Sequence, residues 1–153
     1  MTTENDISGE KRKYTPSEEI AVKSFDLISL KDFNTLGEIL SDDVVFKDPH
    51  FPDVLEGKGN VLTGLGIGFK DVDSIRFNIR VVGNEANTPP TASDMNLNKK
   101  SIFVLTDTYT SLRGGPINLK IGQVFYFETI VTNATEPIIS RIEAYPDYPP
   151  PSD

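Results

Sequence analysis

Four long segments in the second half of the chain alternate between apolar and polar residues, as strands do. The alternation is clearest in residues 74–82, where one face is predicted to carry Ile75, Phe77, Ile79 and Val81. The same pattern predicts three further strands, over residues 101–112, 117–131 and 138–145. Because the strands are grouped after a helical first half, we expect an α+β fold with an antiparallel sheet and not a doubly wound parallel sheet.

Helix signals dominate the first half of the chain. Thr15, Pro16 and Glu18 fit an N-terminal capping box with proline at the first helical position, which predicts a helix over residues 15–30. The other elements expected here are a short helix, a strand and a glycine-containing helix, over residues 32–40, 41–48 and 57–69. Three glycines inside the last of these are unfavourable in a helix, so we expect a weak or bent helix that packs closely against a neighbour.

The composition excludes several classes of function. The chain of 153 residues has no cysteine, one histidine and a formal net charge of −8. It therefore has no cysteine zinc site, disulfide framework or multi-histidine metal centre, and we expect no metal and no cofactor. An acidic surface suits neither nucleic-acid phosphates nor an anionic membrane. The N-terminus has no apolar core and no apolar run is long enough to span a bilayer, so the expected compartment is the cytosol.

The length and the ends of the chain define the expected domain organisation. A chain of this size is typical of a single domain, which we place over residues 14–147. The polar residues 1–13 are expected to be a disordered N-terminal segment. Residues 148–153 form a proline-rich tail that can continue neither a helix nor a sheet.

The stretch SDDVVFKDP, residues 41–49, combines an acidic turn, a strand and an Asp-Pro pair. With the order of elements over residues 16–146, it resembles the nuclear-transport-factor-2-like (NTF2-like) superfamily, which includes ketosteroid isomerases and SnoaL-type polyketide cyclases. The resemblance implies a cone, in which a curved antiparallel sheet wraps around the N-terminal helices and leaves an open mouth. It also implies a pocket for a small molecule and a homodimer that pairs through the sheet.

The resemblance also implies roles for individual residues. Asp48 matches the aspartate that is the general base of ketosteroid isomerases. Ser24 stands where those enzymes have a tyrosine donor, and Gln123 stands where they have an aspartic acid donor, so ordinary ketosteroid isomerisation is not expected. The SnoaL-like proteins imply a carboxylate on the last strand near the pocket, and the candidate is Glu143. Asp48 and Glu143 are therefore the candidate catalytic residues.

Strand alternation then predicts which other side chains line the pocket. If Gln123 points inward, Phe125 does too, and Thr106, Thr108 and Thr110 are expected on the same inner surface. On the last strand, the resemblance implies that the face with Arg141, Glu143 and Tyr145 lines the pocket. The predicted binding residues are Gln123, Arg141, Tyr145, His50, Phe125 and Phe51. Such a pocket suits a small, mostly apolar molecule that carries a carbonyl or hydroxyl group.

The sequence also supports less specific interpretations of these residues. Asp48 before Pro49 suits the cap of a turn, and His50 suits a solvent-exposed loop. Arg141 and Glu143 suit a structural ion pair on a sheet face. Three functions stay open: a cofactor-independent isomerase, cyclase or hydrolase that uses carboxylate acid–base chemistry, a non-catalytic ligand carrier, and a dimeric protein-interaction module.

Overall fold

The computed structural model describes residues 13–49, 51–84, 99–112, 118–131 and 136–146. His50, all but one residue of the segment predicted to be disordered, and the proline-rich tail lie outside the described residues. The elements in chain order are α1 (Pro16–Ser29), α2 (Phe33–Glu38), β1 (Leu40–Lys47), β2 (Leu55–Glu56), α3 (Lys58–Gly68), β3 (Val72–Asn84), β4 (Lys99–Leu112), β5 (Asn118–Ile130) and β6 (Ile138–Pro146). Within these ranges, no helix is both long enough and apolar enough to cross a bilayer.

Helix α1 begins at the predicted capping box. The Thr15 hydroxyl accepts the backbone N–H of Glu18 at 3.2 Å, and the Glu18 carboxylate accepts the backbone N–H of Thr15 at 2.9 Å. One face of the helix is buried, with Ala21 and Phe25 almost fully enclosed. Phe25 contacts three rings of the sheet, and its centroid lies 4.8 Å from that of Phe77 on β3. Local capping thus starts the helix, and aromatic packing holds it against the sheet.

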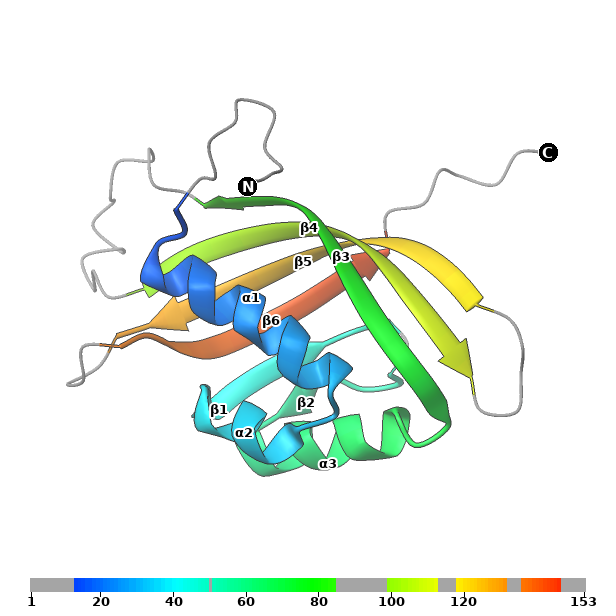
Figure 1. The fold of residues 1–153 in the computed structure, drawn as a ribbon. Helices are drawn as coiled ribbons and strands as arrows, with labels where there is room; N and C mark the ends of the chain where they lie inside the picture. Colours follow the sequence, from blue (N-terminus) through cyan, green and yellow to red (C-terminus); the bar gives the residue numbers. More distant parts are fainter. Residues whose placement is uncertain (1–12, 50, 85–98, 113–117, 132–135, 147–153) are drawn as a thin grey trace.

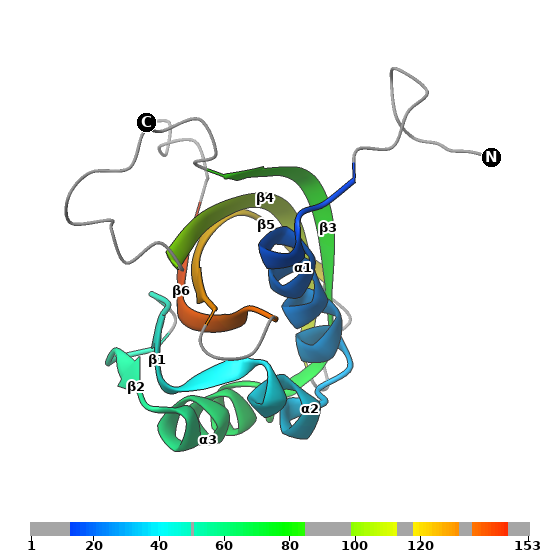
Figure 2. The same ribbon diagram turned by 90° about the vertical axis from the view of Figure 1, so that its left-hand side faces the viewer.

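The strands form a six-stranded sheet in the order β2-β1-β6-β5-β4-β3. Neighbouring strands are antiparallel except β1 and β6, which pair in parallel, so the sheet is mixed. It curves strongly, and α1 lies along its concave side, while α2 and α3 lie beyond β1 (Figures 1 and 2). The α+β architecture with a curved sheet wrapped around helices is therefore confirmed, but the expectation of an entirely antiparallel sheet was wrong for the β1–β6 pair.

A register shift in β3 changes one predicted face. Ile75, Phe77 and Ile79 pack against the core, but Val81 is 57% exposed. The pairing of β3 with β4 shifts between Ile79 and Val81, as at a β-bulge. The extra residue reverses the alternation, so Val82 packs against the core and the prediction for Val81 was wrong.

Helix α3 makes close contacts at two of its glycines. A Cβ on Gly64 would lie 2.5 Å from a methyl carbon of Leu55, and one on Gly68 would lie 2.7 Å from Cζ of Phe51. Real Cβ atoms do not approach other atoms so closely, so a larger residue at either position would force the Leu55 or Phe51 side chain to shift. The expected helix with close packing against a neighbour is confirmed, and the neighbour is the segment between β1 and α3.

Candidate functional site

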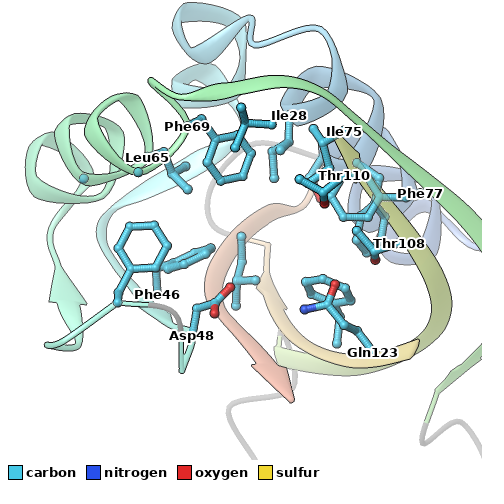
Figure 3. A pocket seen from close by; sticks show the side chains of 18 of the residues that line it. Ile28, Phe46, Asp48, Leu65, Phe69, Ile75, Phe77, Thr108, Thr110 and Gln123 are labelled. Carbon is cyan, nitrogen blue, oxygen red and sulfur yellow. The ribbon is translucent and has the colours of Figure 1, made fainter. Parts of the chain in front are cut away.

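A cavity of about 530 Å³ lies between the concave face of the sheet, α1 and α3. Its wall is mostly apolar and contains seven phenylalanine side chains together with isoleucine, leucine and valine. They come from elements far apart in sequence, and Figure 3 shows labelled examples from α1, β1, α3, β3 and β4 around one hollow. From here on, "the cavity" means this hollow, lined by Ser24, Phe25, Ile28, Phe46, Asp48, Phe51, Pro52, Gly64, Leu65, Ile67, Gly68, Phe69, Val72, Ile75, Phe77, Thr108, Thr110, Ile121, Gln123, Phe125, Phe127 and Ile142.

Asp48 reaches the cavity from the end of β1. Val44 and Phe46 are buried on the inner face of this strand, and Asp48 continues the same period-2 pattern one step beyond its last residue. The turn that follows is closed by a hydrogen bond of 2.9 Å from the backbone N–H of Phe51 to the backbone C=O of Asp48. The carboxylate is partly exposed and points into the cavity (Figure 3). Asp48 is thus placed where a carboxylate can meet a bound molecule.

Gln123 carries the one buried amide side chain among the described residues of the cavity wall. The other buried polar side chains of this wall are the hydroxyls of Ser24 and Thr108. Gln123 is 5% exposed, and its amide points into the hollow (Figure 3). Its cross-strand partner Thr106 has a hydrogen-bonded hydroxyl, which lies 3.0 Å from that of Thr108. Within the part of the chain that the structure describes, the Gln123 amide has no hydrogen-bond partner. Buried amides without a partner are unfavourable, so this group is suited to a ligand.

The inward positions predicted for β4 and β5 are confirmed. Thr108 and Thr110 line the cavity, whereas Thr106 is fully buried and is not part of the cavity wall, so its predicted place in the pocket lining was wrong. Phe125, two residues beyond Gln123, also lines it. Phe51 lines the mouth beside Asp48, with its ring edge-on to Phe46 at a centroid distance of 5.6 Å. Four of the predicted site residues, Asp48, Gln123, Phe125 and Phe51, therefore share one cavity, while His50 lies outside the described residues.

The predicted face of β6 was wrong. Phe125 pairs with Ala144 and Phe127 pairs with Ile142, and residues directly opposite in an antiparallel pair share a face of the sheet. Because both phenylalanines point inward, so do Ile142 and Ala144. The alternate positions of β6 therefore lie on the convex side of the sheet, and they are occupied by Arg141, Glu143 and Tyr145. We call this convex side the outer face. None of these three residues lines the cavity.

On the outer face, these three residues form a local network. Arg141 and Glu143 make an ion pair at 2.7 Å, and the Tyr145 hydroxyl donates a hydrogen bond to the Glu143 carboxylate. This hydrogen bond raises the pKa of Tyr145 above its usual value of 10.0, and burial and the negative charge of Glu143 add to the rise, while Arg141 opposes it. The alternative of a structural ion pair thus describes the geometry of Arg141 and Glu143.

Tyr145 borders a second, more open hollow of about 320 Å³. This hollow lies outside the end of β6 and shares Asp48, Phe51 and Pro52 with the cavity. Arg141 and Glu143 line neither space. Of the three residues predicted on β6, only Tyr145 therefore lines a hollow that Asp48 also lines, and that hollow is not the cavity.

Several cavity residues were missed by sequence reasoning, and four of them, Gly64, Leu65, Ile67 and Gly68, lie on α3. Leu65 on α3 and Phe69 just after it have helical spacing, but nothing in the sequence connected them to Asp48. Ser24 lines the cavity too, although its hydroxyl donates a 2.6 Å hydrogen bond to the backbone C=O of Ala21 within α1. Among the described residues, no three His, Cys, Asp or Glu side chains gather as a metal site requires.

Comparison with known proteins identifies the fold. No protein-family model and no curated protein matches the sequence. Among solved structures, hexachlorocyclohexane dehydrochlorinase LinA-type3 from Novosphingobium barchaimii superimposes with a TM-score of 0.72 at 11% identity, over 87% of this chain and 85% of that one. A proposed dehydratase from the NTF2-like family of Streptomyces avermitilis gives a TM-score of 0.69 at 16% identity, over 88% and 95% of the two chains.

A third structure is similar over the same region. It is a proposed SnoaL-like polyketide cyclase from Shewanella denitrificans, with a TM-score of 0.64 at 18% identity over 88% of this chain and 93% of that one. All three identities are low, so the likeness establishes the fold. The chain has the NTF2-like cone fold that the sequence resemblance implied.

Proposed function

We propose that this protein binds a small, mostly apolar molecule with a carbonyl or hydroxyl group in the cavity and transfers a proton with Asp48. This would make it a cofactor-independent isomerase, cyclase or hydrolase. The similar structures include a dehydrochlorinase and proteins described as a dehydratase and a cyclase, which supports small-molecule chemistry in this fold. The proposal places the base and the hydrogen-bond donor in the same hollow, and it gives no role to Glu143.

One observation carries the proposal: the buried amide of Gln123 faces an apolar cavity and has no hydrogen-bond partner among the described residues. In a filled core, the same position would hold an apolar side chain at lower free energy. An amide offers two N–H donors and one acceptor, which suits a carbonyl or hydroxyl oxygen of a ligand. The surrounding phenylalanines suit the apolar remainder of such a molecule.

The proposed proton transfer uses two groups with separate roles. The Asp48 carboxylate takes a proton from the carbon next to the ligand's carbonyl group, and the electron pair of the broken C–H bond moves into the enolate. The negative charge that develops on the oxygen is stabilised by an N–H of Gln123. The protonated Asp48 then returns the proton to carbon. No redox partner and no metal enter this cycle.

Proton exchange at a simple ketone tests this proposal without knowledge of the natural substrate. In D₂O, the wild-type protein should accelerate the loss of the C1 proton signals of 2-tetralone, measured by NMR. The Asp48→Asn variant should lose at least about 100-fold of this acceleration, because its amide is no base. Glu143→Gln is the matched control and should retain the wild-type rate, since Glu143 lies on the outer face. An unchanged rate in Asp48→Asn would refute the base, and a bound ketone without exchange would point to a carrier.

We further propose that the outer face pairs with a second copy of the chain, in the cytosol. Phe103 is 41% exposed there, and its ring lies 5.2 Å from that of Tyr126. Two charges of this face, Lys99 and Glu128, form an ion pair of 3.3 Å, which lowers the desolvation cost of covering them. Sedimentation should show a dimer that Phe103→Arg dissociates; a monomeric wild-type protein would contradict this part of the proposal.

A further inference from the structure

We infer that the cavity selects uncharged molecules and excludes anionic groups, an inference that deepens the proposed function and rests on it. The charge of the wall carries this inference. Asp48 is the one ionisable side chain among the described residues that line the cavity. The remaining polar side chains of the wall are neutral amides and hydroxyls, from Gln123, Thr108, Thr110 and Ser24.

An anionic ligand would meet no cationic side chain among the described residues that line the cavity. Carboxylate, phosphate and sulfonate groups lose their hydration when they enter an apolar space, and a neutral amide replaces only part of it. The Asp48 carboxylate at the cavity wall adds its own negative charge to this effect. The net charge of −8 acts in the same direction at longer range.

The cations of the neighbouring strands point away from the cavity. Arg76 lies over the ring of Tyr109 on the outer face, with 4.3 Å from its Cζ to the ring centroid. Arg80 pairs with Asp107 at 3.9 Å on the same side of the sheet. Thr108 and Thr110 on β4 point into the cavity, and Asp107 and Tyr109 alternate with them along the strand. Asp107 and Tyr109 therefore point to the outer face, and so do the two arginines that contact them.

Two lysines near the cavity are also directed elsewhere. The ammonium group of Lys31 donates a hydrogen bond to the backbone C=O of Val72. Lys47 follows Phe46 on β1 but points outward, where its ammonium lies 5.6 Å from the centroid of the Tyr145 ring. Neither lysine is part of the cavity wall. The cavity therefore combines one carboxylate with no cationic side chain from the described residues.

A matched pair of fluorescent probes tests the inference. N-phenyl-1-naphthylamine is uncharged, and 8-anilinonaphthalene-1-sulfonate has the same aromatic frame with an added sulfonate. We expect the uncharged probe to bind the wild-type protein, with a fluorescence increase, at least about 100-fold more tightly than the anionic one. Sulfonate fluorescence that an excess of the uncharged probe cannot displace comes from outside the cavity and is subtracted.

Charge variants separate exclusion by charge from exclusion by shape. Thr110→Lys places an ammonium group at the partly exposed edge of the cavity wall, and it should raise affinity for the sulfonate at least about tenfold. Asp48→Asn should also raise this affinity about tenfold, because it removes the negative charge from the cavity wall. Thr63→Lys is the matched control, because Thr63 is exposed on α3 and outside the cavity wall, and it should change neither affinity.

The outcomes distinguish this inference from the proposed function. Equal affinity of the two probes for the cavity would overturn the inference and leave proton transfer by Asp48 untouched. A sulfonate that stays excluded from both Thr110→Lys and Asp48→Asn would show that shape controls entry, which also overturns the inference. Failure of the uncharged probe to bind at all would remove both this inference and the small-molecule cavity beneath it.

Discussion

Replacement of Gln123 by leucine should make the protein more stable and impair its binding. The side chain is 5% exposed, and its amide has no partner among the described residues, so this group loses part of its hydration on folding and gains no hydrogen bond from the described residues to offset the loss. The unfavourable free energy of such a group is about 1–3 kcal/mol. Leucine has no polar group to desolvate, and its added branch can extend into the cavity beside it. We therefore expect Gln123→Leu to gain about 1–2 kcal/mol in the free energy of unfolding.

Thermal unfolding followed by circular dichroism measures this gain. For a chain of this size, 1–2 kcal/mol corresponds to a rise in Tm of about 3–6 °C. Thr106→Val is the matched control, because Thr106 faces the same side and pairs with Gln123 in register, yet its hydroxyl is bonded to that of Thr108 at 3.0 Å. This control should lose about 1 kcal/mol. A loss of stability in Gln123→Leu as large as in the control would refute the claim that the amide is held ready for a ligand.

Two further predictions address packing at the mouth and titration on the outer face. Gly68→Ala should displace the Phe51 ring, because the new Cβ would lie 2.7 Å from it, and this should lower the free energy of unfolding by about 1–3 kcal/mol and weaken probe binding. In the control Gly66→Ala, the new Cβ meets nothing within 4 Å, and the free energy of unfolding should rise by about 0.5–1 kcal/mol. Denaturant unfolding measures the stability of both variants, and fluorescence titration measures their probe binding. In ultraviolet titration, Tyr145 should ionise above pH 10.0, because its pKa is raised by the hydrogen bond to Glu143. The stability due to this hydrogen bond should be present below pH 10.0 and be lost as the pH rises through the raised pKa of Tyr145. Glu143→Gln should lower the pKa of Tyr145 again.

Local signals predicted their elements well because their physical cause lies within a few residues. The capping box of Thr15 and Glu18 needs only the first turn of α1, and both of its hydrogen bonds are present. The bulge that exposes Val81 has no such local cause, since it arises from the register between β3 and β4. The parallel pairing of β1 with β6 likewise depends on residues nearly a hundred positions apart, such as Phe46 and Ile142. The sequence therefore predicted the class of fold but not these details of pairing.

The error on β6 shows which evidence to weigh more heavily. Ile142 and Ala144 alternate with Arg141 and Glu143, and simple burial of the apolar set predicts the face that the structure has. The resemblance to SnoaL-like proteins favoured the opposite face, because it implied a carboxylate near the pocket. Register with β5 decides the matter physically, since Ile142 lies opposite the inward-facing Phe127. A role implied by distant resemblance should therefore yield to the alternation of the strand itself.

The same rule gives a sequence signal for the site. On β1 the inward positions are Val44 and Phe46, and the next one is Asp48; on β5, Gln123 interrupts an inward series with Ile121 and Phe125. A polar residue at a position that alternation assigns to the apolar face is unfavourable for folding alone. Asp48 lies where the strand ends and solvent reaches the carboxylate, whereas Gln123 is deep in the wall. Asp48 and Gln123 therefore reach the same cavity because the sheet curves. The alternation of residues along single strands does not show this curvature.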